Sequence, residues 1–381
     1  EIMSGGTVGP TFEHHVGKEL SAMQWDYTQR SFEGSSYRLA TASRGEGANN
    51  RLTVWNVDPS YGPGYGVPDD RGRDAPAEGT FSVRCEVEAG LPGDAVSVHW
   101  LNVSGERQLV TALGSGRVML FSYVGPGRGE RPQLLAKPNV WEHGSTVRAC
   151  ALHENRHSFA TGGATGAISL WNVCRVRAEA TIIRGTDSLG VHDLQFLSNT
   201  DVAAAGSCTK VWDIREPANG PVQAFYSVKG PDQRAAAKGH RTSFAEVLCI
   251  APHPQQPQLF ATGDAAGTLQ LWDRRRSEAP FASRAAPSAV GGARHGASAS
   301  PLHHLSFHPL SHAVLSSGFD GRTLLWRVPG GSAATGLHSG EDLRPVPLFA
   351  TPFPLTRHDV QPSANLLCAS GLSATLHFLA L

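Results

Sequence analysis

The chain has 381 residues, and its 33 Lys and Arg balance its 33 Asp and Glu, so the formal net charge is zero. This balance argues against a protein that binds nucleic acid directly, because such proteins carry a basic stripe. No apolar run reaches the roughly 18 residues that cross a bilayer, so we expect no membrane insertion. No secretory signal opens the chain, which starts at Glu1 instead of Met, and the six cysteines form no CxxC pair. We interpret these cysteines as the reduced thiols of a cytosolic or nuclear protein.

Short runs of alternating apolar and polar residues recur along the chain, in the order strand, turn, strand, tight turn, strand. Such period-2 runs, bounded by Gly and Pro, predict half-buried β-strands. After a first strand at 11–17, three-strand units are predicted at 20–57, 95–124, 147–173, 191–214, 244–276, 302–328 and 355–380. A fourth strand is predicted after each unit except the last, at 81–88, 134–141, 180–184, 222–228, 281–284 and 346–350.

An aromatic residue stands near the end of each of the first six units. These anchors are Trp55, Phe121, Trp171, Trp212, Trp272 and Trp326. Repeats of about 40–45 residues that end in Trp-Asp are typical of the blades of a WD-repeat β-propeller, and loop insertions lengthen them here. A β-sandwich is the alternative, but sandwiches do not normally repeat one motif around the chain. We therefore predict an all-β fold, a seven-bladed WD-repeat β-propeller, in which the six anchors are packing residues.

The two ends of the chain predict how the ring closes. The last unit lacks an outermost strand, whereas the strand at 11–17 has no unit of its own. We predict that this N-terminal strand pairs with the last blade, because the pairing removes an exposed sheet edge. A single domain then spans 1–381. Long surface loops rich in Gly, Pro, Ala and Ser are predicted at 58–80, 125–133, 229–243, 285–301 and 329–345.

Residues that carry chemistry do not converge in the sequence. The buried hydrogen-bonded set of Trp, Ser or Thr, His and Asp found in many WD blades survives only in fragments, such as Asp320 and His143, so we expect the blades to rely on apolar packing. The densest histidine group is His303, His304, His308 and His312. It has no Cys or carboxylate nearby at a ligand spacing, and we interpret it as ordinary strand and turn residues. We predict no catalytic residue, no cofactor and no metal, and hence no enzyme.

Several segments resemble one family of WD-repeat proteins in sequence, length and order. They are KVWDIREP (210–217), HPQQPQLFATGDAAGTLQLWDRR (253–275), HHLSFHPLSHAVL (303–315), LLCASGLSATLHFLAL (366–381) and the early stretch 12–25. The family is that of the WD-repeat nucleoporins of the Y-shaped outer-ring complex of the nuclear pore. The loops at 58–80 and 285–301 show no such resemblance.

This resemblance implies a non-catalytic scaffold subunit in the nucleus, at the nuclear envelope, within the nuclear pore complex. It implies other nucleoporins of the Y complex as partners, above all the helical nucleoporin of the short arm. Protein import and mRNA export would then depend on the assembled pore. No homo-oligomer is required.

A second interpretation rests on two Trp-Asp-x-Arg motifs. Their charged residues are Asp213 and Arg215 in one, and Asp273 and Arg275 in the other. Both motifs fit the pattern of propellers that serve as substrate receptors of cullin-type ubiquitin ligases or as other adaptors. Asp and Arg after a blade Trp are common in any WD repeat, so both interpretations stay open. Anchors for a partner are expected at blade edges and loops, for example Arg274–Arg276 or Phe225–Tyr226.

Overall fold

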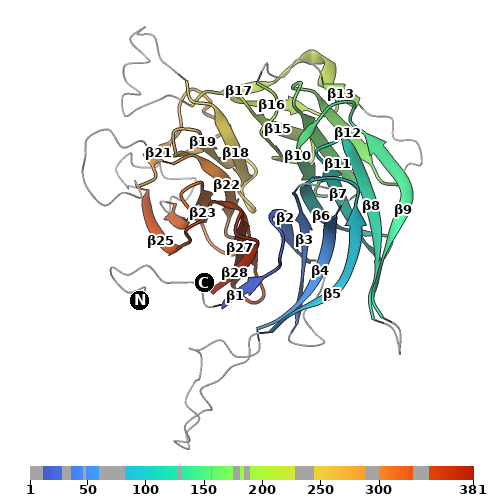
Figure 1. Ribbon diagram of the computed structural model, residues 1–381. Coiled ribbons are helices and arrows are strands. Elements are labelled where there is room, and N and C mark those ends of the chain that lie inside the picture. The colour runs from blue at the N-terminus through green and yellow to red at the C-terminus, as the bar shows by residue number, and fades with distance from the viewer. Residues whose placement is uncertain are drawn as a thin grey trace, which may run out of the picture.

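The strands of this protein form seven four-stranded antiparallel sheets that follow one another around a ring (Figure 1). The structure is a computed structural model, and it describes residues 12–27, 36–45, 49–59, 82–126, 131–155, 157–174, 181–183, 189–227, 244–287, 300–328 and 343–381. The predicted all-β, seven-bladed propeller is confirmed. Among these residues, no helix is long and apolar enough to span a membrane.

In each of the first six blades the strands lie in chain order from the inside of the ring outward. Blade 1 consists of β2 (Leu20–Trp25), β3 (Tyr37–Ser43), β4 (Asn50–Asp58) and β5 (Ser82–Leu91). Blade 2 consists of β6 (Ala95–Val103), β7 (Glu106–Leu113), β8 (Arg117–Val124) and β9 (Gln133–Glu142). Blade 3 consists of β10 (Val147–Leu152), β11 (Ser158–Gly163), β12 (Ile168–Asn172) and β13 (Thr181–Ile183).

The second half of the ring continues this order. Blade 4 consists of β14 (Asp193–Phe196), β15 (Asp201–Ala205), β16 (Thr209–Asp213) and β17 (Gln223–Phe225), with the 3-10 turn η1 (Pro217–Asn219) between the last two. Blade 5 consists of β18 (Val247–Pro252), β19 (Leu259–Asp264), β20 (Thr268–Asp273) and β21 (Ala282–Ala285). Blade 6 consists of β22 (Leu302–Phe307), β23 (Ala313–Gly318), β24 (Arg322–Arg327) and β25 (Arg344–Ala350). Blade 7 consists of β26 (Leu355–Gln361), β27 (Leu366–Gly371), β28 (Thr375–Ala380) and β1 (Phe12–His15).

The N-terminal strand closes the ring, as predicted. β1 pairs antiparallel with β28, in a register that places Phe12 opposite Phe378 and His15 opposite Thr375. Figure 1 shows β1 beside β28, near the C-terminus of the chain. The ring centroids of Phe12 and Phe378 lie 6.2 Å apart. The pairing covers the edge of β28 that blade 7 would otherwise leave open to another chain.

The long predicted loops fall mainly outside the part of the chain that the structure describes. This holds for most of 58–80, 285–301 and 329–345 and for all of 229–243, whereas part of 125–133 is described. Two strands end earlier than predicted. The strand expected at 11–17 is β1, which ends at His15, and the strand expected at 222–228 is β17, which ends at Phe225. After it, the Ser227 hydroxyl donates to Oδ2 of Asp264 at 2.7 Å, which draws the chain toward blade 5.

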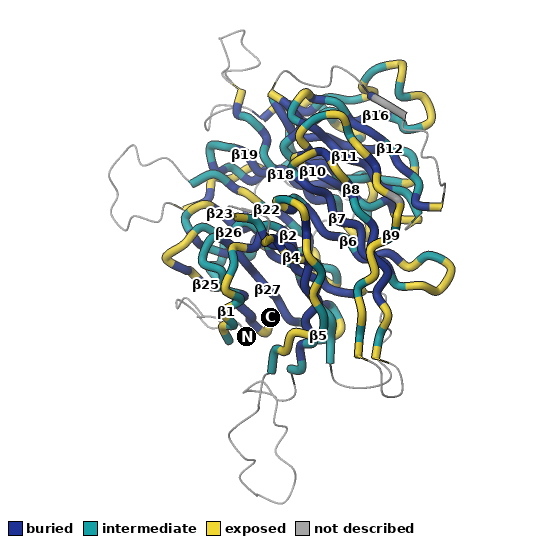
Figure 2. Tube along the Cα trace, turned by 45° about the vertical axis from the view of Figure 1, so that its right-hand side comes forward, coloured by how far each residue is buried: buried dark blue, intermediate teal, exposed yellow. Residues whose placement is uncertain are grey.

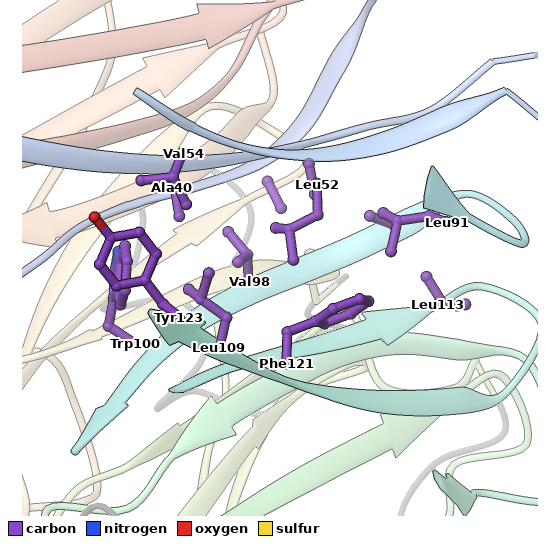
Figure 3. Packing of buried hydrophobic residues seen from close by; sticks show 13 residues of the cluster. Ala40, Leu52, Val54, Leu91, Val98, Trp100, Leu109, Leu113, Phe121 and Tyr123 are labelled. Carbon is purple, nitrogen blue, oxygen red and sulfur yellow. The ribbon is translucent and has the colours of Figure 1, made fainter. Parts of the chain in front are cut away.

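The core lies between neighbouring blades, because each sheet packs on both of its faces. β27 is buried at all six positions instead of alternating, and Figure 2 shows buried residues along the strands and exposed ones at the turns. Between blades 1 and 2, Leu52 and Val54 of β4 face Trp100 and Phe121, which are 2% and 1% exposed (Figure 3). Full burial of such a side chain stabilises the fold by about 1.5–3 kcal/mol.

The six aromatic anchors all lie in the interior. Their exposed fractions are 7% for Trp55, 1% for Phe121, 6% for Trp171, 2% for Trp212, 1% for Trp272 and 0% for Trp326. Each anchor lies opposite a residue of the second strand of its own blade. Its side chain packs in the hydrophobic cluster between that blade and the preceding one in the ring.

Four anchors also donate a hydrogen bond from the indole Nε1 to a hydroxyl on the second strand. The four bonds are Trp55–Thr41 at 2.8 Å, Trp171–Thr161 at 2.8 Å, Trp272–Thr262 at 2.9 Å and Trp326–Ser316 at 2.8 Å. In blade 3, Nδ1 of His143 lies 2.8 Å from the same Thr161 hydroxyl. The expectation that this network survives only in fragments is therefore wrong for its Trp–hydroxyl pair. A turn Asp and a loop His were the fragments named from the sequence, whereas the Thr or Ser hydroxyl on the second strand is present in these four blades.

Candidate docking surface

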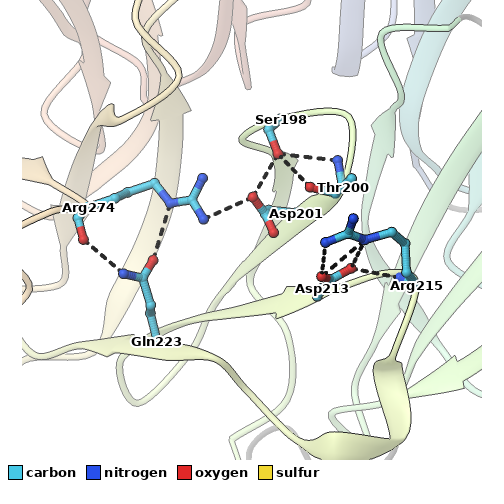
Figure 4. Close-up of polar contacts among 7 residues, drawn as sticks. All are labelled: Ser198, Thr200, Asp201, Asp213, Arg215, Gln223 and Arg274. Atoms are coloured by element: carbon cyan, nitrogen blue, oxygen red, sulfur yellow. Dashed lines mark hydrogen bonds and ion pairs between the residues drawn. The ribbon is translucent and has the colours of Figure 1, made fainter.

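The two Trp-Asp-x-Arg motifs form the same turn at the ends of β16 and β20. In blade 4, the backbone N–H of Arg215 donates to Oδ1 of Asp213 at 2.9 Å, and its Nε and Nη2 donate at 2.9 and 2.5 Å (Figure 4). In blade 5, Arg275 repeats these bonds to Asp273 at 2.9, 2.9 and 2.6 Å. Each Arg therefore closes the turn that ends its own strand, which gives both motifs a local structural role.

The turns present positive charge outward. The side chains of Arg215 and Arg275 are 69% and 58% exposed, whereas those of Asp213 and Asp273 are 21% and 11% exposed. The hydrogen bonds from Arg215 lower the pKa of Asp213 to about 2, and those from Arg275 lower the pKa of Asp273. The carboxylates therefore stay ionised at neutral pH beneath guanidinium groups that face the solvent.

Arg274 lies differently from its neighbour Arg275, because it joins blade 5 to blade 4. Its Nη2 forms an ion pair with Oδ2 of Asp201 at 2.9 Å, and its Nε donates to Oε1 of Gln223 at 3.2 Å. Gln223 returns a hydrogen bond from Nε2 to the Arg274 carbonyl at 2.8 Å, and the Ser198 hydroxyl donates to Asp201 at 2.7 Å (Figure 4). The side chains of Arg274 and Asp201 are only 18% and 17% exposed. Arg274 thus belongs to a fixed contact between the two blades.

An open groove of about 600 Å³ lies along this contact, and we call it the blade 4–5 groove. Its lining consists of Ser198, Val222, Gln223, Pro257, Gln258, Arg274 and Arg275. Val222 is 56% exposed there although it is aliphatic. The groove lies at the face of the ring where the inner strands end, since its residues come from the turns after β14, β16, β18 and β20.

The opposite face, where the inner strands begin, carries exposed aromatic residues over blades 4 to 7. Tyr226 and Phe244 are 50% and 47% exposed, with ring centroids 5.2 Å apart. Phe319 and Phe353 are 54% and 51% exposed, and His303 lies 5.4 Å from the Phe319 ring. The sequence suggested Phe225–Tyr226 as a contact for a partner. Phe225 is only 1% exposed, so of this pair only Tyr226 is available to a partner.

The four clustered histidines point to four different partners. The contacts are His303 with Phe319, His304 Nδ1 with His358 Nδ1 at 3.3 Å, His308 Nε2 with Asn365 Oδ1 at 3.0 Å, and His312 Nδ1 with His253 Nε2 at 3.1 Å. Burial lowers the pKa of His358 to about 3 and the pKa of His304 well below its usual value, so both stay neutral. Within the described ranges, no group of three or more His, Cys, Asp or Glu is placed to hold a metal ion.

A repeated histidine contact was missed by the sequence argument. In three blades, the His after the inner strand accepts a backbone N–H at Nδ1, and its Nε2 reaches the next blade. The three are His153 (Asn155 N–H, 3.0 Å; Asn199 carbonyl, 2.9 Å), His253 (Gln255 N–H, 3.1 Å; His312, 3.1 Å) and His308 (Leu310 N–H, 3.2 Å; Asn365, 3.0 Å). The signal was present in the sequence, as one His at the same place in three repeats.

Comparison with known proteins agrees with this architecture. Residues 138–172 and 233–273 match the repeat described as WD domain, G-beta repeat. The chain is 22% identical over 278 residues to nucleoporin Nup43 of Homo sapiens, and equally to that of Mus musculus. Each match covers 70% of this chain and 64% of the relative, so it spans less than two thirds of the relative's length. The resemblance to WD-repeat nucleoporins is thereby confirmed.

A solved structure shows the same fold. One chain of a structure titled Crystal Structure of Mitotic Checkpoint Complex superposes with a TM-score of 0.62 at 16% sequence identity, and the match covers 100% of this chain and 94% of that one. At this identity the likeness concerns the propeller alone.

Proposed function

We propose that this protein is a non-catalytic scaffold subunit of the outer ring of the nuclear pore complex. The observation that carries the proposal is the similarity to Nup43 over 278 residues, in a chain that folds as a WD-repeat propeller. The same similarity supports localisation at the nuclear envelope. As a scaffold within the assembled pore, the protein in this proposal supports protein import and mRNA export.

The partners proposed are other nucleoporins of the Y complex, foremost the helical nucleoporin of its short arm. A propeller suits such a role because its rigid blades hold surface side chains in fixed places. The exposed aromatic residues Phe319 and Phe353 and the arginines beside the blade 4–5 groove are of the residue types enriched at protein interfaces. A stable interface typically buries about 800 Å² on each partner.

The alternative function is that of a substrate receptor of a cullin-type ubiquitin ligase. One observation favours it: the guanidinium groups of Arg215 and Arg275 are exposed in equivalent turns of neighbouring blades. The same turns are explained by their closure onto Asp213 and Asp273, which requires no partner. We therefore rank the scaffold first.

One experiment separates the two functions. The full chain, tagged and expressed in cells, is imaged and then purified by affinity, and the bound proteins are identified by mass spectrometry. The scaffold function predicts a signal at the nuclear rim and outer-ring nucleoporins in near-stoichiometric amounts. A diffuse signal together with a cullin ligase adaptor, without nucleoporins, would overturn it in favour of the receptor.

A further inference from the structure

The blade 4–5 groove has an apolar part that is open to solvent, and we call this part its floor. Val222 and Pro257 both line it, and Val222 is 56% exposed. The whole groove has a volume of about 600 Å³, which lies within the range of roughly 300–1,000 Å³ that is typical of ligand-binding pockets. Concave places of this kind receive the anchor side chains that dominate binding energy at interfaces. The floor therefore suits an aliphatic or aromatic side chain from a partner.

The wall of the groove is already fixed. Arg274 is held by Asp201 at 2.9 Å and by the reciprocal bonds with Gln223, and Ser198 in turn holds Asp201. Side chains that are immobile before binding lose little conformational entropy when a partner arrives. Arg274 thus shapes the groove, and its charge is already matched by Asp201.

At the rim of the groove, the guanidinium group of Arg275 has only part of its N–H groups in hydrogen bonds. Arg275 donates from Nε and Nη2 to Asp273, and its Nη1 makes no hydrogen bond to any described residue. Its side chain is 58% exposed, and the Asp273 carboxylate beneath it is 11% exposed. A carboxylate from outside therefore meets guanidinium N–H groups before it meets the buried acid, and such charge-assisted bonds are short and strong.

We propose that the blade 4–5 groove is a docking site for a segment of a partner protein that carries an apolar side chain next to a carboxylate. The apolar side chain lies over Val222 and Pro257, and the carboxylate accepts hydrogen bonds from Nη1 of Arg275. This inference rests on the proposed function, which supplies a nucleoporin as the partner. It adds the surface used and the residue types that the segment presents.

The test uses the tagged full chain and measures how much outer-ring nucleoporin each variant recovers from cells. Val222→Glu puts a charge on the floor, and Arg275→Gln removes the rim charge. Leu310→Glu is the control for the first, because Leu310 is 67% exposed on the same face but in blade 6. Arg215→Gln is the control for the second, because Arg215 makes the same turn in blade 4 and does not line the groove. Thermal melting of each purified variant checks that it is folded.

We expect both groove variants to recover at least about tenfold less nucleoporin than the wild type, and both controls to recover wild-type amounts. If all variants recover wild-type amounts, the scaffold function stands and the groove is not the docking site. Equal loss in controls and groove variants also contradicts the groove, as does loss confined to a Phe319→Ser variant of the aromatic face. If the wild-type chain itself recovers no nucleoporin, the proposed function fails, and the partner assigned to the groove fails with it.

Discussion

Thr111 holds in blade 2 the position that Thr262 holds in blade 5, but the two hydroxyls have different surroundings. Thr262 accepts the indole N–H of Trp272 at 2.9 Å. In blade 2 the anchor is Phe121, whose side chain has no N–H, and the buried hydroxyl of Thr111 has no hydrogen-bond partner among the described residues. A buried polar group without a partner costs about 1–3 kcal/mol. The Phe at this anchor thus supplies no N–H to the hydroxyl that the Trp anchors of blades 1, 3, 5 and 6 use as an acceptor.

The same substitution should therefore act oppositely in the two blades. Thr262→Val leaves the Trp272 N–H buried without an acceptor, and we expect the free energy of unfolding to fall by about 1–3 kcal/mol. Thr111→Val removes an unpaired hydroxyl at nearly constant volume, and we expect no loss and a gain of up to about 1 kcal/mol. Urea denaturation of both variants measures the difference. Similar losses in both would show that the Thr111 hydroxyl is paired after all.

Asp359 makes stability depend on pH in an unusual direction. Its carboxylate accepts the backbone N–H of Trp25 at 2.8 Å and the hydroxyl of Tyr27, but desolvation outweighs these bonds and raises its pKa from 3.8 to about 6. Between these values the folded chain binds more protons at this site than the unfolded chain, so this group lowers the free energy of unfolding as pH rises from about 4 to 6.

Asp359→Asn should remove this contribution. The amide loses an acceptor at every pH, but that cost is constant. The difference in the free energy of unfolding, Asn variant minus wild type, should therefore increase between pH 4 and pH 7, on the order of 2–3 kcal/mol. Urea denaturation at several pH values gives this difference, and all other titrating groups cancel in it. A difference that stays flat or falls with pH would show that the pKa of Asp359 is not raised.

At the scale of elements, closure depends on one short strand. β1 has four residues and carries the only pairing of the outer edge of β28 within the described residues. Deletion of residues 1–17 should therefore expose this edge and the side of Phe378, so that soluble yield falls and aggregation rises. Deletion of 1–10, which keeps β1, is the control. Size-exclusion chromatography and thermal melting measure both, and a monomeric 1–17 deletion with an unchanged melt would contradict closure by β1.

Strands could be predicted from the sequence, whereas contacts between strands could not. β9 and β25 were predicted at 134–141 and 346–350 and lie at Gln133–Glu142 and Arg344–Ala350, because alternation and turn residues mark each strand locally. The Trp–hydroxyl pairs depend on the register between the second and third strands of a blade. In blades 3, 5 and 6, a Thr or Ser stands ten residues before the Trp, and this repeated spacing would have revealed the pairs. The blade 4–5 groove joins residues from Ser198 to Arg275, and no local pattern predicts how two blades pack.

At the scale of the whole molecule, the ring couples side chains that are far apart in the chain. Arg38 of β3 forms a two-bonded ion pair with Glu86 of β5 at 2.9 and 3.3 Å, and Tyr123 of β8 donates to the same carboxylate at 2.7 Å. The buried cluster that Figure 3 shows continues this contact between blades 1 and 2. Six such interfaces follow the chain order, and the seventh, between blades 7 and 1, joins its two ends.

The strand that closes the ring is made long before the strand with which it pairs. His15 and Thr375 are 360 residues apart, and a ribosome adds roughly 5–20 residues each second. For roughly twenty seconds to a minute, therefore, β1 is outside the ribosome while its partner strand does not yet exist, and the first six blades emerge as an open arc. During that time the unpaired strand and the open edges of the arc are exposed, so the growing chain is more prone to aggregate than the closed ring.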